Sequence, residues 1–119
     1  MTESVLFKTL GEPVHMLEIL PGENLSEMQG KIHQNALDHG WWETQRTIPE
    51  LLVLIHSEVS EALEAYRKDD RDLYREELAD VFIRLLDACQ GYGIDLEKEV
   101  IRKHKINISR PYKHGGKRL

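Results

Sequence analysis

Hydrophobic residues recur at helical spacing through most of the chain after residue 25. Two strongly periodic stretches, residues 51–66 and 73–86, are joined by the polar turn KDDRD and predict a helical hairpin. A shorter periodic stretch starts near Ser26 and stops at Gly40. Ser26 and Gln29 have the spacing of a capping box. A fourth stretch, LEKEVIRKHKINI, begins after Asp95. The pattern predicts an all-α domain built as a four-helix bundle.

Capping residues indicate where the hairpin helices begin and end. Thr47 lies three residues before Glu50, which is again capping-box spacing, and the helix should continue to about Arg67. Asp70 is a good N-cap for the next helix, which should end at Gly91 or at Gly93.

The first 25 residues lack this periodicity. Two short apolar runs, SVLFKTL and VHMLEIL, are separated by Gly-Glu-Pro, and the second run ends at Pro-Gly. These features predict a hairpin or a pair of irregular extended segments. We therefore divide the chain into an N-terminal extension, residues 1–25, and a helical domain, residues 26–119.

The predicted hairpin carries two pairs of acidic residues, and each pair is spaced by three positions. Glu58 and Glu61 lie in the first helix, and Glu77 and Asp80 lie in the second. This spacing places both members of a pair on one face of a helix. Glu58 falls inside the apolar stripe, where an unpaired carboxylate is costly. A divalent cation held by all four carboxylates would relieve their mutual repulsion, so we expect a metal site here.

Composition limits the class of protein and its partners. The 119 residues suit one domain, and 40% hydrophobic with 31% charged residues is typical of a soluble globular protein. The net charge of −5 argues against non-specific binding to nucleic acid or to an anionic membrane. No apolar run approaches the roughly 20 residues that span a bilayer. The single cysteine, Cys89, fits a core thiol, and we expect a cytoplasmic protein.

Two adjacent tryptophans, Trp41 and Trp42, follow the predicted stop at Gly40. At least one of these large rings is expected to cap the core. The other could stack on a nucleobase near the carboxylates. The candidates for base contacts in this region are His33, Gln34, Trp41 and Trp42.

Basic residues are concentrated toward the C-terminus, whereas the middle of the chain is acidic. Lys103, Asn107 and Arg110 follow one another at steps of four and three, so they share a face at the end of the last helix. Next to a metal cluster, such a face could hold the outer oxygens of a polyphosphate. Lys113 and Lys117 are weaker candidates for the same role.

Taken together, these motifs resemble the all-α NTP pyrophosphatase superfamily, which contains MazG-like proteins and dimeric dUTPases. The resemblance rests on E58-x-x-E61, E77-x-x-D80 and the Lys-Asn-Arg run, and it covers roughly residues 26–118. The strings LIHSEVSEALEAYR and EELADVFIRLLD resemble its two acidic helices, and RPYKHGGK resembles a phosphate-binding tail. Two departures are the N-terminal extension and Ser57, where many members carry a further glutamate.

The resemblance implies Mg²⁺-dependent hydrolysis of a nucleoside triphosphate, NTP or dNTP, to the monophosphate and pyrophosphate, with Mn²⁺ as a substitute ion. The four acids would hold the metal, and a metal-activated water would attack the α-phosphorus. The basic candidates would steady the phosphates. The resemblance also implies a four-helix bundle completed by association of subunits. The breadth of the apolar stripes favours the same conclusion, so we expect a homodimer or a homotetramer.

Three other interpretations remain open. A di-iron carboxylate bundle needs Glu-x-x-His on core helices, and Glu12 with His15 is the one such spacing, interrupted by Pro13. A helical interaction module would leave all the acids solvated, as we expect for Glu64 and Glu76. A regulatory module would bind nucleotide or metal without turnover.

Overall fold

The computed structural model describes residues 14–112 of the chain. This part contains a 3₁₀-helix and four α-helices: η1 (Val14–Leu17), α1 (Leu25–Asp38), α2 (Ile48–Arg67), α3 (Arg71–Gly91) and α4 (Leu96–Ile108). None of the described residues lies in a strand, so the all-α prediction is confirmed. No helix within residues 14–112 is both long enough and apolar enough to cross a membrane.

Helices α2, α3 and α4 begin where the sequence predicts, and each has an N-cap side chain. The side chains of Thr47, Asp70 and Asp95 each accept a hydrogen bond from a backbone N–H three residues further on. These bonds satisfy N–H groups that have no partner within the helix. The position of each helix start is therefore fixed by its own first turn.

The predicted start of α1 at Ser26 is wrong by about one residue, and its cap is a different residue. Asn24 and Glu27 form the capping box, with Asn24 Oδ1 accepting from the Glu27 N–H at 2.8 Å. Ser26 instead makes tertiary contacts, because its Oγ donates to Asp95 at 3.1 Å and its N–H donates to Glu97 at 2.8 Å. Ser26 therefore ties α1 to the beginning of α4.

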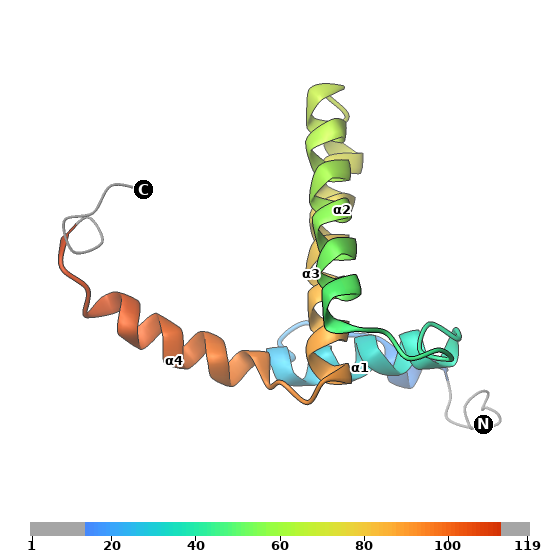
Figure 1. The fold of residues 1–119 in the computed structure, drawn as a ribbon, viewed down its shortest axis with the longest axis horizontal. Helices are drawn as coiled ribbons and strands as arrows, with labels where there is room; N and C mark the ends of the chain where they lie inside the picture. The colour runs from blue at the N-terminus through green and yellow to red at the C-terminus, as the bar shows by residue number, and fades with distance from the viewer. Residues whose placement is uncertain (1–13, 113–119) are drawn as a thin grey trace.

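Helices α2 and α3 stand side by side as a hairpin, and α1 lies across its base against α3 (Figure 1). Helix α4 touches α1 at its own first turn and then leads away from the hairpin (Figure 1). The turn into α4 uses Gly93, whose φ of +71° favours glycine. Within the described residues, the buried hydrophobic side chains are Leu51, Ala62, Ala65, Leu86 and Cys89.

The N-terminal segment differs from the prediction where it is described. Val14–Leu17 form the short helix η1 instead of an extended segment. Packing of this turn against α1 is a tertiary effect that the irregular apolar pattern did not reveal. The other predicted run, residues 4–10, lies outside the described residues.

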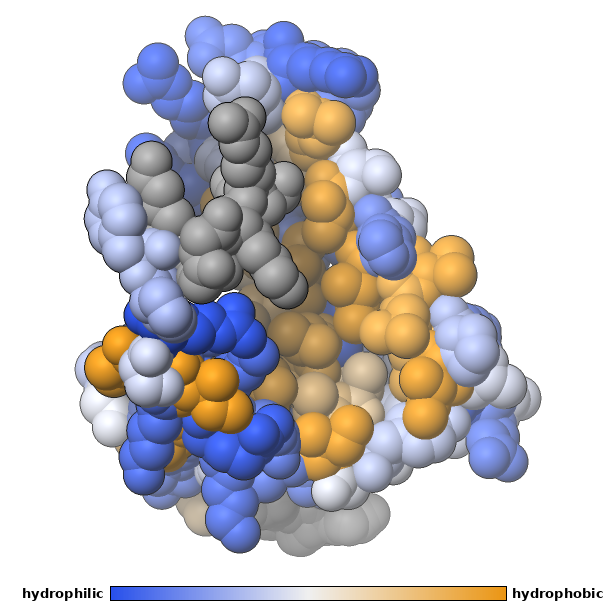
Figure 2. Space-filling view, turned by 60° about the vertical axis from the view of Figure 1, so that its left-hand side comes forward, coloured by the Kyte–Doolittle hydropathy of each residue, from blue (hydrophilic) through white to orange (hydrophobic). Residues whose placement is uncertain are grey.

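A broad apolar surface remains exposed on this chain. Figure 2 shows hydrophobic side chains gathered over one face of the molecule, with polar side chains at the margins. Exposed large hydrophobic residues of the hairpin and of α4 include Val59, Leu63, Leu73, Leu78, Phe82, Val100, Ile101 and Ile108. Patches of this kind usually mark an interaction surface.

Candidate metal and nucleotide site

Three of the predicted acids converge between α2 and α3. Oxygen atoms of Glu58, Glu77 and Asp80 lie within 4.8 Å of one another. Glu58 is buried within the helix pair, as its place in the apolar stripe predicts, whereas Asp80 is exposed. Glu61 is exposed and lies outside this group of three. Clustered carboxylate oxygens are the donors that Mg²⁺ and Mn²⁺ take in proteins, so the donor set fits such an ion.

The neighbouring negative charges affect the pKa of Glu77. Desolvation raises the pKa of its carboxyl group, and the negative charge of Glu61 raises it further. Asp80 and Glu58 act in the same direction. Glu61 therefore contributes to the electrostatics of the cluster although its oxygens do not join the group of three.

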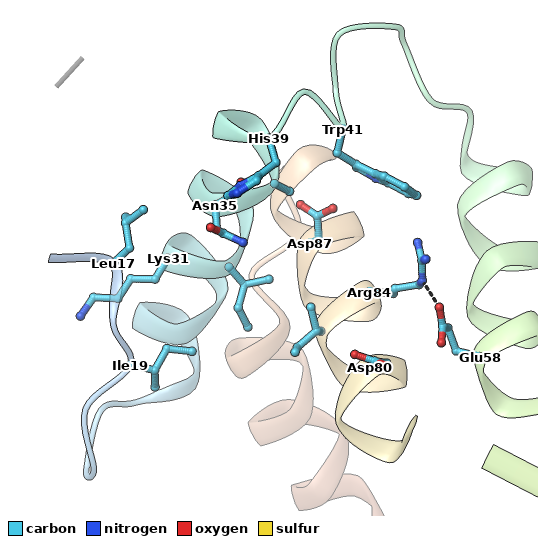
Figure 3. Close-up of a pocket in the computed structure, with 13 residues that line it drawn as sticks. Leu17, Ile19, Lys31, Asn35, His39, Trp41, Glu58, Asp80, Arg84 and Asp87 are labelled. Atoms are coloured by element: carbon cyan, nitrogen blue, oxygen red, sulfur yellow. Dashed lines mark hydrogen bonds and ion pairs between the residues drawn. The ribbon is translucent and has the colours of Figure 1, made fainter. Parts of the chain in front are cut away.

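Glu58 is paired with a cation that the sequence analysis did not identify. The Nε atom of Arg84, on α3, donates to Oε2 of Glu58 at 2.5 Å (Figure 3). Arg84 lies four residues after Asp80, so it shares a face of α3 with the acidic pair. That spacing is the sequence signal that could have identified it.

A pocket of about 560 Å³ adjoins the acidic cluster. Glu58, Asp80 and Arg84 line one side of it, and Asn35 of α1 and the following His39 line another (Figure 3). The remaining lining residues are Leu17, Ile19, Lys31, Ile32, Ala36, Trp41, Ile83 and Asp87. The pocket thus places polar and aromatic side chains beside the carboxylates, which is the character of a small-molecule site.

Trp41 lines this pocket, and two arginines contact its ring. The guanidinium carbon of Arg46 lies 3.8 Å from the centroid of the Trp41 ring, and that of Arg84 lies 4.8 Å from it. Arg46 Nε also donates to the Trp41 carbonyl at 3.0 Å. Cation–π contacts of this kind fix the orientation of a ring that would otherwise be mobile.

Trp42, in contrast, is hydrogen-bonded within the protein and does not line this pocket. Its Nε1 donates to the buried carboxylate of Asp87 at 3.0 Å, and His33 Nδ1 lies 2.7 Å from the same carboxylate. The Trp42 ring also meets His33 edge-on at a centroid distance of 5.3 Å. His33 and Trp42 therefore contact Asp87 rather than lining the pocket, and this agrees with the expectation that one tryptophan caps the core.

Gln34 lies apart from the acidic cluster. Its side chain donates to Asp38 at 2.9 Å and lines a separate pocket with residues of η1. Asn35 of α1 and His39, the residue that follows α1, are polar residues that do line the pocket beside the acids, and the sequence did not single them out as site residues. They lie one and five positions after Gln34, and only the placement of α1 against α3 selects that face.

The phosphate-binding candidates lie on or just after α4, away from the acids of the same chain. Lys103 and Asn107 are in α4, Arg110 follows its end at Ile108, and all three are exposed. Helix α4 points away from the hairpin (Figure 1). Within one chain the structure does not bring them to the carboxylates. Lys113 and Lys117 lie outside the described residues.

Comparison with known proteins gives one match. Residues 46–112, more than half of the 119-residue chain, match the family model described as the MazG nucleotide pyrophosphohydrolase domain. The matched segment contains the acidic hairpin and α4, whereas α1 precedes it. No curated protein and no solved structure matches the chain.

Proposed function

We propose, from the premise that this chain belongs to the MazG nucleotide pyrophosphohydrolase family, that it hydrolyses nucleoside triphosphates, NTP or dNTP, to the monophosphate and pyrophosphate. One observation carries the proposal: the oxygens of Glu58, Glu77 and Asp80 meet within 4.8 Å, next to a pocket walled by Trp41. Carboxylates beside an aromatic wall suit a ligand that has both phosphates and a base.

Glu58, Glu61, Glu77 and Asp80 are proposed to hold Mg²⁺, with Mn²⁺ as a substitute. A bound divalent ion would offset the charge of the triphosphate and make a water molecule more acidic. Glu61 is our candidate to accept the proton of the attacking water. Its exposed carboxylate lies outside the group of three but close enough to raise the pKa of Glu77, so one of its oxygens could contact the ion while the other takes the proton.

The pocket is proposed to take the base. Trp41 could stack on the base in place of one of the two guanidinium groups that contact its ring. Asn35 and His39 offer polar groups for the edge of the base. His33 and Trp42 would act through Asp87, whose carboxylate they both contact and which also lines the pocket. Gln34 remains a candidate for contacts further along the ligand.

Phosphate binding is proposed to involve a second copy of the chain. Lys103, Asn107 and Arg110 are exposed on a helix that leads away from the acids of its own chain. The exposed apolar residues of the hairpin and of α4 offer a surface on which another copy could pack. In a homodimer or homotetramer, α4 of one subunit would supply cations to the acids of its neighbour. Lys113 and Lys117 are further candidates.

The proposal is tested by incubating the protein with each NTP and dNTP in the presence of Mg²⁺. We expect nucleoside monophosphate and pyrophosphate in equal amounts, and no product after the divalent ion is chelated. Asp80→Asn should reduce turnover by at least about 100-fold, because it removes a ligand of the ion that offsets transition-state charge.

Glu64→Gln and Glu76→Gln are matched controls, since each removes one charge from an exposed position on the same two helices. Both should retain turnover. Release of orthophosphate in place of pyrophosphate would contradict attack at the α-phosphorus. Nucleotide binding without any product would favour the regulatory module, and neither binding nor product would favour the interaction module.

A further inference from the structure

Arg84 connects two parts of the pocket that the proposed function uses separately. Its Nε lies 2.5 Å from Oε2 of Glu58, and its guanidinium carbon lies 4.8 Å from the centroid of the Trp41 ring. Figure 3 shows Trp41, Arg84 and Glu58 following one another along the same wall. A single side chain therefore contacts both a carboxylate of the acidic cluster and the aromatic face.

Arg84 brings positive charge to the acidic cluster through its ion pair with Glu58. Glu58 is buried, with 8% of its surface exposed, and its carboxylate lies close to those of Glu77 and Asp80. A buried carboxylate is costly unless a positive group is paired with it. A divalent ion in the cluster would draw on the same carboxylate charge and would repel the guanidinium. Arg84 occupies Oε2 of Glu58, so an ion that binds this oxygen would have to displace the guanidinium.

The Trp41 ring does not depend on Arg84 for its position. The Arg46 guanidinium stacks on the ring at 3.8 Å, and its Nε donates to the Trp41 carbonyl. Its Nη1 pairs with Glu50 at 3.1 Å. Arg84 is also only partly buried, with 31% of its side chain exposed, and it lines the pocket. The guanidinium can therefore leave Glu58 while remaining against a ring that stays in place.

We propose that Arg84 is an exchangeable counter-ion of this site. It holds Glu58 while the metal is absent, and it turns to an anionic ligand in the pocket when a divalent ion takes over that carboxylate. The inference rests on the proposed function in one respect, namely that the acids hold such an ion. Its consequence is positive coupling, because ion binding releases a cation for the phosphate-bearing ligand.

The first test is calorimetric titration of the nucleotide-free protein with Mg²⁺. Arg84→Met removes the rival cation, so we expect it to bind Mg²⁺ at least about fivefold more tightly than the wild type. Arg102→Met is the matched control, because Arg102 pairs with Glu99 on α4 and the variant removes the same charge elsewhere. Its Mg²⁺ affinity should equal that of the wild type.

The second test uses tryptophan fluorescence during the same titration. In the wild type, movement of Arg84 against the Trp41 ring should change the emission as Mg²⁺ binds. Arg84→Met should lose this response. Arg46→Met should keep it, because Arg46 stacks on the same ring and pairs with Glu50, outside the acidic cluster. Arg84→Gln, which retains a donor for Glu58 without a charge, repeats both tests if Arg84→Met does not fold.

The outcomes separate this inference from the proposed function. Unchanged or weaker Mg²⁺ binding by both Arg84 variants overturns the inference, even if the wild type hydrolyses nucleotides. Tighter binding by them with no hydrolysis by the wild type supports the inference and removes the proposed function. A wild type that binds no Mg²⁺ overturns both.

Discussion

Glu58 and Glu77 are both glutamates, but their carboxyl groups lie in different surroundings. Glu58 is buried and ion-paired with Arg84, whereas Glu77 faces Glu61, Asp80 and Glu58, and desolvation together with these charges raises its pKa. The position of Glu58 inside the apolar stripe predicts its burial. Its pairing with Arg84 could not be predicted with the same certainty, because a helix surface offers several partners at comparable spacing.

This contrast predicts opposite effects of neutral substitutions on stability in metal-free buffer at pH 7. Glu77→Gln should raise the melting temperature, because a raised carboxyl pKa means that the ionised form costs the folded state free energy. The cost is full above the raised pKa of the folded state and fades as the pH falls from there to the ordinary glutamate pKa of 4.5, so the gain should vanish near pH 4. Glu58→Gln should lower the free energy of unfolding by about 1–3 kcal/mol, because it removes the negative charge that pairs with Arg84 and leaves a weaker, neutral acceptor.

Thermal unfolding monitored by circular dichroism at several pH values measures both effects, with a chelator present throughout. Glu64→Gln is the control for the loss of an exposed charge. A destabilised Glu77→Gln at pH 7 would contradict the repulsion that we assign to the cluster.

At the scale of the elements, helix starts are predictable where the cap is local. Thr47, Asp70 and Asp95 bond their own first turns, and each starts a helix as expected. Ser26 looks equally suitable, but Asn24 is the cap, and Ser26 bonds Asp95 across 69 positions. A sequence pattern gives the possible local bonds and does not reveal which side chains are taken by tertiary contacts.

The close approach of α3 to the Trp42 ring gives a prediction at this scale. A Cβ atom added at Gly91 would lie 2.5 Å from Cη2 of Trp42, and that ring is fixed by its bond to Asp87. Gly91→Ala should therefore destabilise the protein by about 1–3 kcal/mol, as overpacking does. Denaturant unfolding followed by tryptophan fluorescence measures this directly.

Gly30 offers the matched control for that substitution. It lies within α1, and a Cβ added there would meet nothing within 4 Å. Gly30→Ala should stabilise the protein by about 0.5–1 kcal/mol, since alanine favours a helix over glycine. Equal effects of the two substitutions would show that Trp42 moves freely, contrary to our account of its role.

At the scale of the whole molecule, the direction of α4 separates two groups of candidate residues. The sequence predicts that Lys103, Asn107 and Arg110 share one helix face. The structure places Lys103 and Asn107 one turn apart in α4, but the helix ends at Ile108, so the prediction is wrong for Arg110. The sequence could not predict that α4 leads away from the acids, because that direction depends on the backbone at Gly93 and on the bonds of Ser26. Neither signal appears in the periodicity of α4 itself.

If the site is shared between subunits, two inactive variants should restore each other. Asp80→Asn and Arg110→Ala should each be nearly inactive, because one lacks an acid and the other lacks a phosphate-binding cation. After the two are unfolded together and refolded, random pairing into dimers would rebuild intact sites and return about a quarter of wild-type turnover. Pyrophosphate release measures the recovery.

A mixture of Asp80→Asn with Glu77→Gln is the control, because both changes affect the hairpin and no combination of subunits rebuilds an intact acidic cluster. It should stay inactive. Failure of the first mixture to recover, with both variants folded, would place the acids and the cation in the same chain.

The apolar face described above also bears on the fate of a chain that has not yet met another copy. Side chains such as Leu63, Phe82 and Ile108 stay in water on a solitary molecule, which favours aggregation and places the chain within reach of chaperones and proteases. The cellular lifetime of the protein would then depend on how quickly newly made copies find one another. Surplus molecules, and fragments that end before α4, would be the first to be degraded.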